Sequence, residues 1–175
     1  SYVKSLLEAG KSVITSNKDL IAEKGVELHE IAVASGVELS YEASVCGGIP
    51  LLKPIRECLV GDNILEIVGI VNGTTNFILT KMNEEGLDYS EALSMAQKLG
   101  FAEADPTSDV EGLDAIRKIT ILSRIGLNIK LDWKTLPVEG ITQISSEDVA
   151  YLKKTGKVIK LMGMTKLFEI GRAHV

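Results

Sequence analysis

The spacing of apolar residues changes repeatedly along the first 42 positions, and each change predicts a new element. The predicted elements are a helix over 2–10, a strand over 11–15, a helix over 19–35 and a strand over 37–42. Gly10 and Gly36 stand where the two helices should end, because glycine readily takes the left-handed conformation that closes a helix. This alternation is typical of an open parallel sheet covered by helices.

Beyond residue 42 the pattern becomes more helical. The predicted elements are a Gly-rich turn over 43–50, helices over 51–59, 76–85 and 88–100, a strand over 64–71, a long helix ending near 126, strand character over 133–143, a helix over 146–154 and a strand from 158 to about 164. Asp88 and Glu91 have the spacing of a capping box, and a threonine of the Thr74-Thr75 pair is expected to cap the helix over 76–85. The expected fold class is therefore α/β followed by α+β.

Composition and charge exclude several classes of protein. Of the 175 residues, 45% are hydrophobic and 25% are charged, which suffices for a sizeable core. Nineteen Lys and Arg against 24 Asp and Glu give a net charge of -5 with no basic run, so we expect no nucleic-acid partner. No apolar stretch approaches the ~18 residues of a membrane span, and Cys46 and Cys58 form no metal-binding or disulfide pattern. We expect a soluble cytoplasmic protein without membrane partners.

The segment 103–114 contains an unusually high number of acidic residues. Five carboxylates occur in these twelve residues with no base among them: Glu103, Asp105, Asp109, Glu111 and Asp114. Such a cluster repels itself unless a cation is near. Lys118 follows Asp114 by one helical turn and precedes two apolar positions by three and four residues, so it is expected on the apolar face beside an acid.

Two interpretations of this segment compete. In the first, Asp105 caps a turn opened by Pro106, Asp109 caps the helix, and Asp114 and Lys118 form an ordinary helical ion pair worth about 0.3–0.5 kcal/mol. In the second, the acidic cluster binds an amine and Lys118 transfers a proton, because burial and charged partners tune a lysine for acid–base work. The second is favoured, since a lysine on a buried face costs stability unless it is used.

The segment Ala96 to Lys118 matches the spacing A-x3-G-F-A-x2-D-P-x2-D-V-x-G-x-D-x3-K without a gap, and it resembles the signature of the homoserine dehydrogenase family. Three further segments resemble the family in its order: V-I-T-S-N-K at 13–18, Y-E-A-S-V-C-G-G-I-P at 41–50 and G-I-V-N-G-T-T-N-F-I-L at 69–79. The resemblance extends to about Met164. It implies an NAD- or NADP-dependent oxidoreductase that transfers hydride reversibly between L-aspartate 4-semialdehyde and L-homoserine, in threonine, methionine and isoleucine biosynthesis.

The resemblance also implies roles for single residues. Lys118 matches the family's proton donor, and Asp109 matches a supporting acid near the reacting centre. The positions that match substrate-binding residues are Glu103, Asp114, Gly73 and Thr74. Carboxylates suit a substrate with an amino group. Gly73 and Thr74 can equally be a turn and a helix cap.

Two further sets of residues match the family's cofactor and cation sites. Lys18 and Gly100 match positions near the cofactor, although a solvated loop lysine and a helix-ending glycine explain them too. The positions that match a monovalent-cation loop, for sodium or potassium, are Glu42, Val45, Gly47 and Ile49. Backbone carbonyls of a Gly-rich turn with one carboxylate make an oxygen cage, and a plain strand-to-helix turn is the alternative. Cys46 stands between two of these positions, where a small residue is expected.

The resemblance divides the chain into parts. Residues 1–40 are expected to be the end of a Rossmann-like dinucleotide-binding domain, and 41–168 a mixed-sheet catalytic and dimerisation domain. The phosphate-binding motif G-x-G-x-x-G does not occur, so we expect an internal fragment with little or no turnover by itself. Residues 169–175 are expected to be a non-native tail without function.

The expected partners are the small-molecule substrate and a second copy of the chain in a homodimer. The alternative function is a non-catalytic assembly or regulatory domain of a larger protein. A third possibility is that the parent protein also carries an aspartokinase domain.

Overall fold

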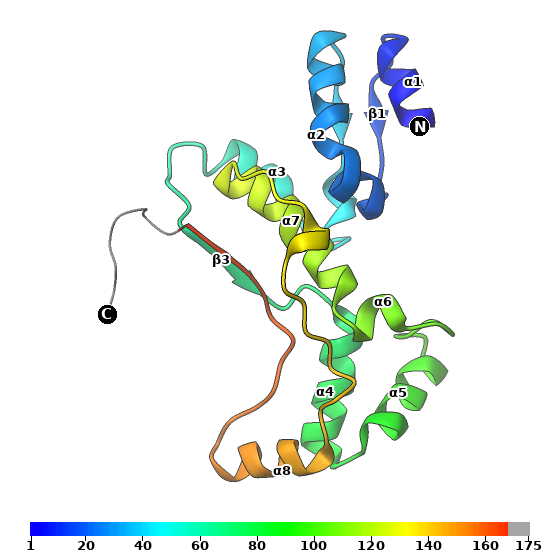
Figure 1. Cartoon of the computed structure of the whole chain (residues 1–175), viewed down its shortest axis with the longest axis vertical. Coiled ribbons are helices and arrows are strands. Elements are labelled where there is room, and N and C mark those ends of the chain that lie inside the picture. The colour runs from blue at the N-terminus through cyan, green and yellow to red at the C-terminus, as the bar shows by residue number, and fades with distance from the viewer. Residues whose placement is uncertain (168–175) are drawn as a thin grey trace. The chain divides into compact units, whose positions relative to one another are not determined.

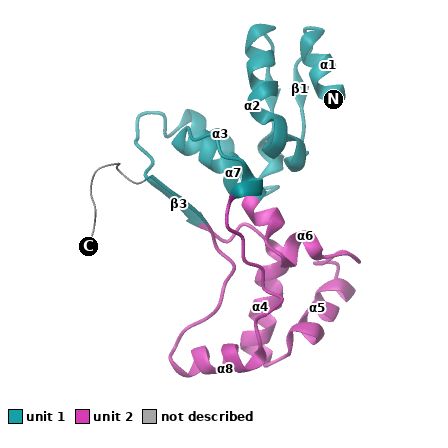
Figure 2. Cartoon of the chain, in the orientation of Figure 1, with its two compact units in different colours: residues 1–68, 117–135, 164–175 teal, residues 69–116, 136–163 magenta. Residues whose placement is uncertain are grey.

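The computed structural model describes residues 1–167, and its elements are labelled in Figure 1. The chain divides into two compact units built from separate stretches of sequence (Figure 2). Unit 1 contains 1–68, 117–135 and the described residues after 163, and unit 2 contains 69–116 and 136–163. The domain boundary expected between residues 40 and 41 does not coincide with a boundary between the two units, and it stays a prediction. The tail expected over 169–175 lies outside the described residues.

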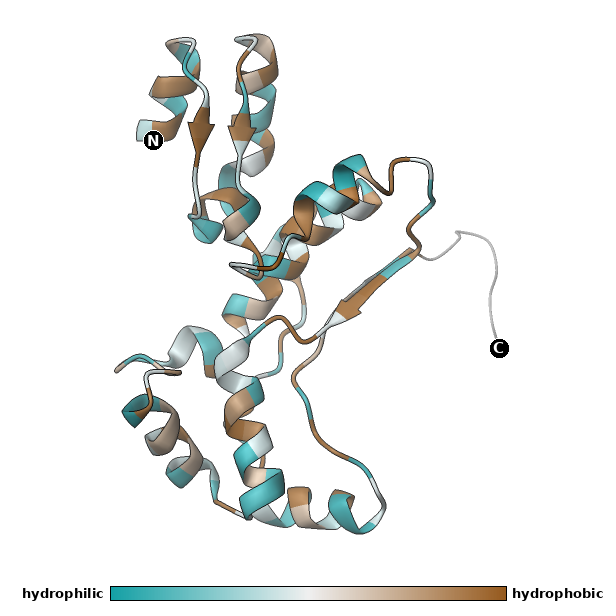
Figure 3. Ribbon diagram, turned by 180° about the vertical axis from the view of Figure 1, so that it is seen from behind, coloured by the Kyte–Doolittle hydropathy of each residue, from teal (hydrophilic) through white to brown (hydrophobic). Residues whose placement is uncertain are grey.

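Unit 1 begins with a β-α-β arrangement. The first four elements of this unit are α1 (Tyr2–Glu8), β1 (Val13–Ile14), α2 (Lys18–Ala34) and β2 (Leu39–Ser40). The two strands are parallel, with Val13 opposite Leu39, as the alternation of elements predicted. Buried Leu7 and Leu28 belong to the two helices beside the strands, and Figure 3 colours β1 as hydrophobic.

The remaining elements of unit 1 follow a turn. They are the 3-10 helix η1 (Glu42–Ser44), α3 (Leu52–Glu57), β3 (Glu66–Gly69), α7 (Leu113–Leu127), the 3-10 helix η2 (Trp133–Thr135) and β4 (Gly163–Lys166). Strands β3 and β4 form a second two-stranded sheet. Helix α7 begins in unit 2, and β3 and β4 each have one residue there. The mixed helix-and-sheet class is confirmed, whereas the Rossmann-like and mixed-sheet arrangements stay predictions.

Unit 2 is built around α4. Its helices are α4 (Gly73–Glu85), α5 (Tyr89–Lys98), the short α6 (Thr107–Val110) and α8 (Ser146–Lys154). The core combines residues of α4, of α5 and of the later chain, namely Ile78, Leu79, Met82, Ala92, Ala96, Ile141 and Val149. The capping box of Asp88 and Glu91 is confirmed at the start of α5. Gly86 takes the left-handed conformation with φ 71° and ends α4.

Three local predictions are wrong. Residues 133–143 do not form a strand: they contain η2 and an irregular segment, because Pro137 lacks an amide donor and Gly140 packs against the backbone of Val110. Strand β4 begins at Gly163 rather than at 158. Helix α4 begins at Gly73 and its cap is Asn72, not a threonine.

Candidate functional site

The N-terminus of α4 places a buried amide between two carboxylates. Asn72 is 5% exposed, and its Oδ1 accepts from the backbone N–H of Thr75 at 2.8 Å, which caps the helix. Its Nδ2 is then oriented to donate to Asp109 Oδ1 at 2.7 Å and to Asp114 Oδ2 at 2.9 Å. Since an amide nitrogen carries two protons, each carboxylate receives one of them. Asn72 therefore fixes the start of α4 and positions both acids.

The chain between α6 and α7 brings Asp109 and Asp114 to this amide. Asp109 lies in α6, and Asp114 is the second residue of α7 and 4% exposed. Gly112 makes the turn between these helices with φ 78°, where a Cβ would come 3.0 Å from the side chain of Val138. The helix dipole favours a carboxylate in the first turn of α7. Local backbone geometry thus explains why a buried acid is tolerated here.

Thr74 connects the same acids to the loop after α5. Its Oγ1 lies 2.7 Å from the carbonyl oxygen of Phe101 and 2.9 Å from Asp109 Oδ2. The hydroxyl has one proton, which can serve one of these two acceptors at a time. The Phe101 ring stacks on Phe77 of α4 with centroids 4.4 Å apart. The loop is therefore held on α4 by a polar and an aromatic contact.

The acidic segment does not behave as one cluster. Asp105 accepts hydrogen bonds from the hydroxyl of Thr107 at 2.6 Å and from its backbone N–H at 3.1 Å, and these bonds lower the pKa of Asp105. The first interpretation, a local cap, is confirmed for Asp105. Asp109 instead lies inside α6 and contacts Asn72 and Thr74, so the helix-cap interpretation is wrong for it.

Three other predicted site residues of unit 2, Gly73, Gly100 and Glu103, lie near Thr74 or Asp109 in the sequence. Gly73 is the exposed first residue of α4, and a Cβ there would meet no atom within 4 Å. Gly100 follows α5 with φ 79° and is equally open. Glu103 is exposed, and its carbonyl oxygen accepts from Gln97 Nε2 at 3.2 Å. Unit 2 thus brings Thr74, Asp109 and Asp114 into one hydrogen-bonded group.

The two predicted lysines belong to unit 1. Lys118 is half-buried in α7, one turn after Asp114 on the same helix. Lys18 is the half-buried first residue of α2 and follows β1 through the capping residue Asn17, whose Oδ1 accepts from Leu20 N at 2.9 Å. Lys18 therefore lies beyond the carboxyl end of a parallel strand, where open sheets bind ligands.

The predicted cation loop gives Glu42 a structural partner. Its carboxylate accepts from the backbone N–H groups of Leu51 at 2.6 Å, Leu52 at 2.9 Å and Lys53 at 2.7 Å, at the start of α3. Burial raises the pKa of Glu42, but the three hydrogen bonds together outweigh it and the pKa is lowered. The carboxylate is thus engaged by α3, and the oxygens available to a cation are the carbonyls of the turn.

The turn itself has an unusual backbone. Cys46 and Gly47 both take positive φ, 56° and 47°. Such a conformation is uncommon for a residue other than glycine, so Cys46 carries a local strain. Val45 is fully buried beside it, and Ile49 N donates to Cys46 O at 3.0 Å. The expectation of a small residue at 46 agrees with this conformation.

Sequence reasoning missed Asn72. The signal was present, because asparagine is among the strongest N-cap residues and here precedes Gly-Thr-Thr and an apolar helix. Its contacts with Asp109 and Asp114 had no local signal, since they join residues 37 and 42 positions apart.

In residues 1–167, no group of three or more His, Cys, Asp or Glu side chains is arranged to hold a metal ion. None of the helices in the same range has the length and apolar character needed to cross a membrane.

The chain is similar to known proteins along most of its length. The family model described as homoserine dehydrogenase matches residues 50–175. The homoserine dehydrogenase of Bacillus subtilis is 51% identical over 94% of this chain, and that of Corynebacterium glutamicum is 46% identical over 95%. The chain spans only 38% and 37% of these two relatives.

Solved structures agree with these relatives. A homoserine dehydrogenase from Thiobacillus denitrificans superposes with a TM-score of 0.92 at 45% identity, over 95% of this chain and 39% of that one. A hyperthermophilic archaeal homoserine dehydrogenase in complex with NADPH superposes with a TM-score of 0.80 at 33% identity, over 94% of this chain and 48% of that one. Because the family model covers more than half of the sequence, the chain belongs to the homoserine dehydrogenase family.

Proposed function

We propose that the protein carrying this chain is an NAD(P)-dependent homoserine dehydrogenase, which interconverts L-aspartate 4-semialdehyde and L-homoserine. The group formed by Asn72, Thr74, Asp109 and Asp114 is the observation that carries the proposal. Two carboxylates held by one buried amide form a rigid negative site, and such a site suits the ammonium group of an amino-acid substrate. The proposed substrate-binding residues are Asp114, Thr74, Gly73 and Glu103.

Lys118 is the proposed proton donor. Reduction of the aldehyde adds a hydride to the carbonyl carbon and leaves a negative charge on the oxygen, which requires a proton. Lys118 lies one turn after Asp114 on α7 and is half-buried, so the helix fixes its spacing from an acid. Asp109, held by Asn72 and Thr74, is the proposed supporting acid.

Two residues of this chain fit the neighbourhood of a nicotinamide. The open backbone at Gly100 permits close approach of a flat ring, and Lys18 stands at the N-terminal end of α2 after β1. When bound, NADH or NADPH supplies the hydride. Lys18 and Gly100 are the proposed contacts to it.

Only some of the ligand atoms expected for a monovalent cation are available in the turn after β2. The Glu42 carboxylate is engaged by α3, so the ligands we propose are carbonyl oxygens of Glu42, Val45, Gly47 and Ile49. Their proposed role is structural, because a cation there would stabilise the strained turn at Cys46. We further propose a cytoplasmic homodimer, with 1–40 as the end of the dinucleotide-binding domain and 41–168 in the catalytic domain.

Replacement of Lys118 tests the function. In the intact protein, Lys118→Ala should lower kcat for aspartate semialdehyde reduction by several powers of ten with the oligomeric state unchanged. Lys157→Ala, at an exposed lysine, is the matched control and should leave kcat unchanged. Unchanged turnover of Lys118→Ala would refute the proton-donor role.

The rival function, a non-catalytic assembly or regulatory domain, predicts a different result. It requires that the intact protein show no semialdehyde reduction at all, with either cofactor. The purified 175-residue chain is expected to have little or no turnover by itself, and measurable reduction by this chain would contradict that expectation.

A further inference from the structure

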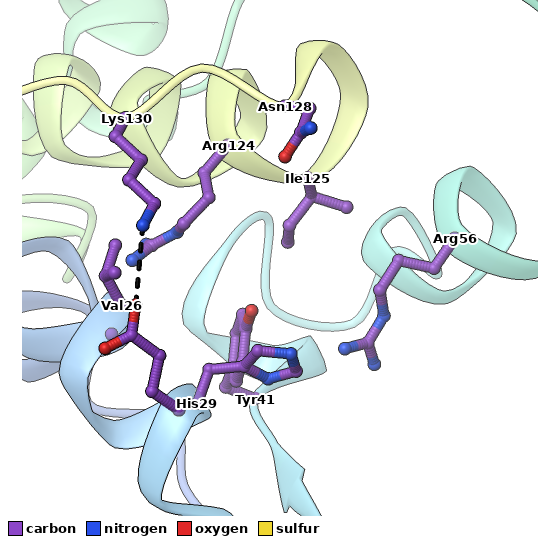
Figure 4. Close-up of a pocket in the computed structure, with 10 residues that line it drawn as sticks. Val26, His29, Tyr41, Arg56, Arg124, Ile125, Asn128 and Lys130 are labelled. Atoms are coloured by element: carbon purple, nitrogen blue, oxygen red, sulfur yellow. Dashed lines mark hydrogen bonds and ion pairs between the residues drawn. The ribbon is translucent and has the colours of Figure 1, made fainter. Parts of the chain in front are cut away.

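Unit 1 contains a cavity whose lining residues all belong to that unit. Its volume is ≈ 270 Å³, and it lies between the second half of α2, the end of α3 and the C-terminal end of α7 (Figure 4). Three cationic side chains line it, Arg56, Arg124 and Lys130, against one carboxylate, Glu30. The α2 residues that line it begin at Gly25, seven positions after Lys18, which corresponds to about 10 Å along a helix.

Arg124 is the central feature of this cavity. One of its terminal nitrogens, Nη2, donates to the carbonyl oxygen of Ile21 at 2.9 Å. Its Nε–H is buried and has no hydrogen-bond partner among the described residues. No carboxylate of residues 1–167 forms an ion pair with it, and burial lowers the pKa of Arg124. Because arginine stays protonated, a buried charge without an anion is costly.

The other charges leave the cavity positive. Lys130 Nζ lies 3.4 Å from Glu30 Oε1, so these two neutralise each other. Arg56 lies over the ring of the buried Tyr41, at 5.7 Å from its centroid, and adds a second positive charge to the lining. The cavity therefore has two guanidinium groups and no carboxylate left to balance them.

Helix α2 is adapted to the Arg124 side chain. Gly25 is buried in its middle, and a Cβ at this position would lie 2.5 Å from Arg124 Nη1. Glycine inside a helix costs about 1 kcal/mol relative to alanine. The missing side chain allows the guanidinium to rest directly against the helix.

We propose that this cavity binds a small anion, a carboxylate or a phosphate group, through Arg124 with support from Arg56. A guanidinium matches the planar or tetrahedral oxygens of such groups with paired hydrogen bonds. The neighbouring apolar surface of Val26, Ile125 and Tyr41 has room for a short carbon skeleton attached to the anion. None of the residues proposed for the reaction lines this cavity, and the proposal does not rest on the proposed function.

Titration calorimetry of the intact protein with two probes, inorganic phosphate and malonate, tests the site at low ionic strength. We expect at least one probe to bind, and Arg124→Met to weaken that binding at least about tenfold. Phosphate binding alone would indicate a phosphate ester, and malonate binding alone would indicate a carboxylic acid. Lys53→Ala, at an exposed lysine of α3 that does not line the cavity, should bind as the wild type does.

Gly25→Ala provides a second variant that keeps every charge. The added methyl group should displace the guanidinium and weaken probe binding, whereas the helix itself gains from alanine. This variant decides the matter if Arg124→Met fails to fold. The proposal is overturned if neither probe binds at about 10 mM, a concentration far above the dissociation constant of a specific site. It is also overturned if both variants bind normally, or if saturating NADPH and homoserine abolish binding.

Discussion

The side chain of Asn72 donates a hydrogen bond to Asp114 at 2.9 Å, although 42 positions separate the two residues. Both are almost fully buried. The same amide group caps α4, so the conformation of that helix end and the position of the acid depend on one another. A buried carboxylate that loses its donor pays a desolvation cost, which makes Asn72 a positioning residue for the proposed substrate site.

Replacing Asn72 should therefore change the chemistry as well as the stability. In the intact protein, Asn72→Ala is expected to lower kcat/KM by roughly tenfold to a hundredfold, the range found when a partner that orients a metal ligand is removed. Asn72→Asp should also move the acid limb of the pH–rate profile to higher pH, because a third negative charge raises the pKa of its neighbours. Steady-state kinetics across pH measures both. Asn63→Ala, at an exposed position, serves as the control, and a normal profile for Asn72→Asp would argue against the positioning role.

Thr74 should depend on its hydroxyl rather than on its shape. Thr74→Ser keeps the Oγ1 contacts with Phe101 and Asp109 and is expected to retain most activity. Thr74→Val preserves the volume but removes the donor, and a lost hydrogen bond to a charged group costs about 1.5–3 kcal/mol. We expect KM for the semialdehyde to rise about tenfold or more in Thr74→Val, measured at saturating cofactor. Equal KM values for the two variants would show that the hydroxyl has no role in binding.

Glu42 predicts a pH dependence of stability. Its pKa in the folded chain is lowered from the ordinary 4.5, because the three N–H groups of α3 outweigh the effect of burial. The stabilisation is thus present above pH 4.5 and is lost as the pH falls through the lowered value. Glu42→Gln should cost about 1 kcal/mol at neutral pH, and its difference from the wild type should shrink in acid. Urea unfolding at several pH values measures this, and a difference that is constant with pH would contradict it.

Gly140 should tolerate no side chain. A Cβ there would lie 2.7 Å from the Cα of Glu111, which is backbone and cannot rotate away. The neighbouring Ile141 N–H also donates to Val110 O at 2.8 Å, so the two segments cannot separate without losing that bond. Gly140→Ala is expected to destabilise the protein by about 1–3 kcal/mol. Gly61→Ala, where a Cβ meets open space, should change the unfolding midpoint little.

Local sequence determined most of the helices. Glycines at 10, 36 and 86 end them because these positions take the left-handed conformation, and Asp88 with Glu91 begins α5 as a capping box. These signals act within a few residues, so they are readable without a structure. The homoserine dehydrogenase resemblance was readable for the same reason, since its motifs are continuous in sequence.

Tertiary structure decided the polar site around Asn72 and the places where the local predictions are wrong. The segment 133–143 has strand-like residues, yet its backbone packs against α6 at Gly140 instead of pairing in a sheet. Asn72 has a cap signal, but only folding brings Asp109 and Asp114 to its other donors. The Arg124 cavity depends likewise on Gly25, which is 99 positions away. Contacts between residues so far apart have no periodic trace in the sequence, because they arise from how whole helices pack.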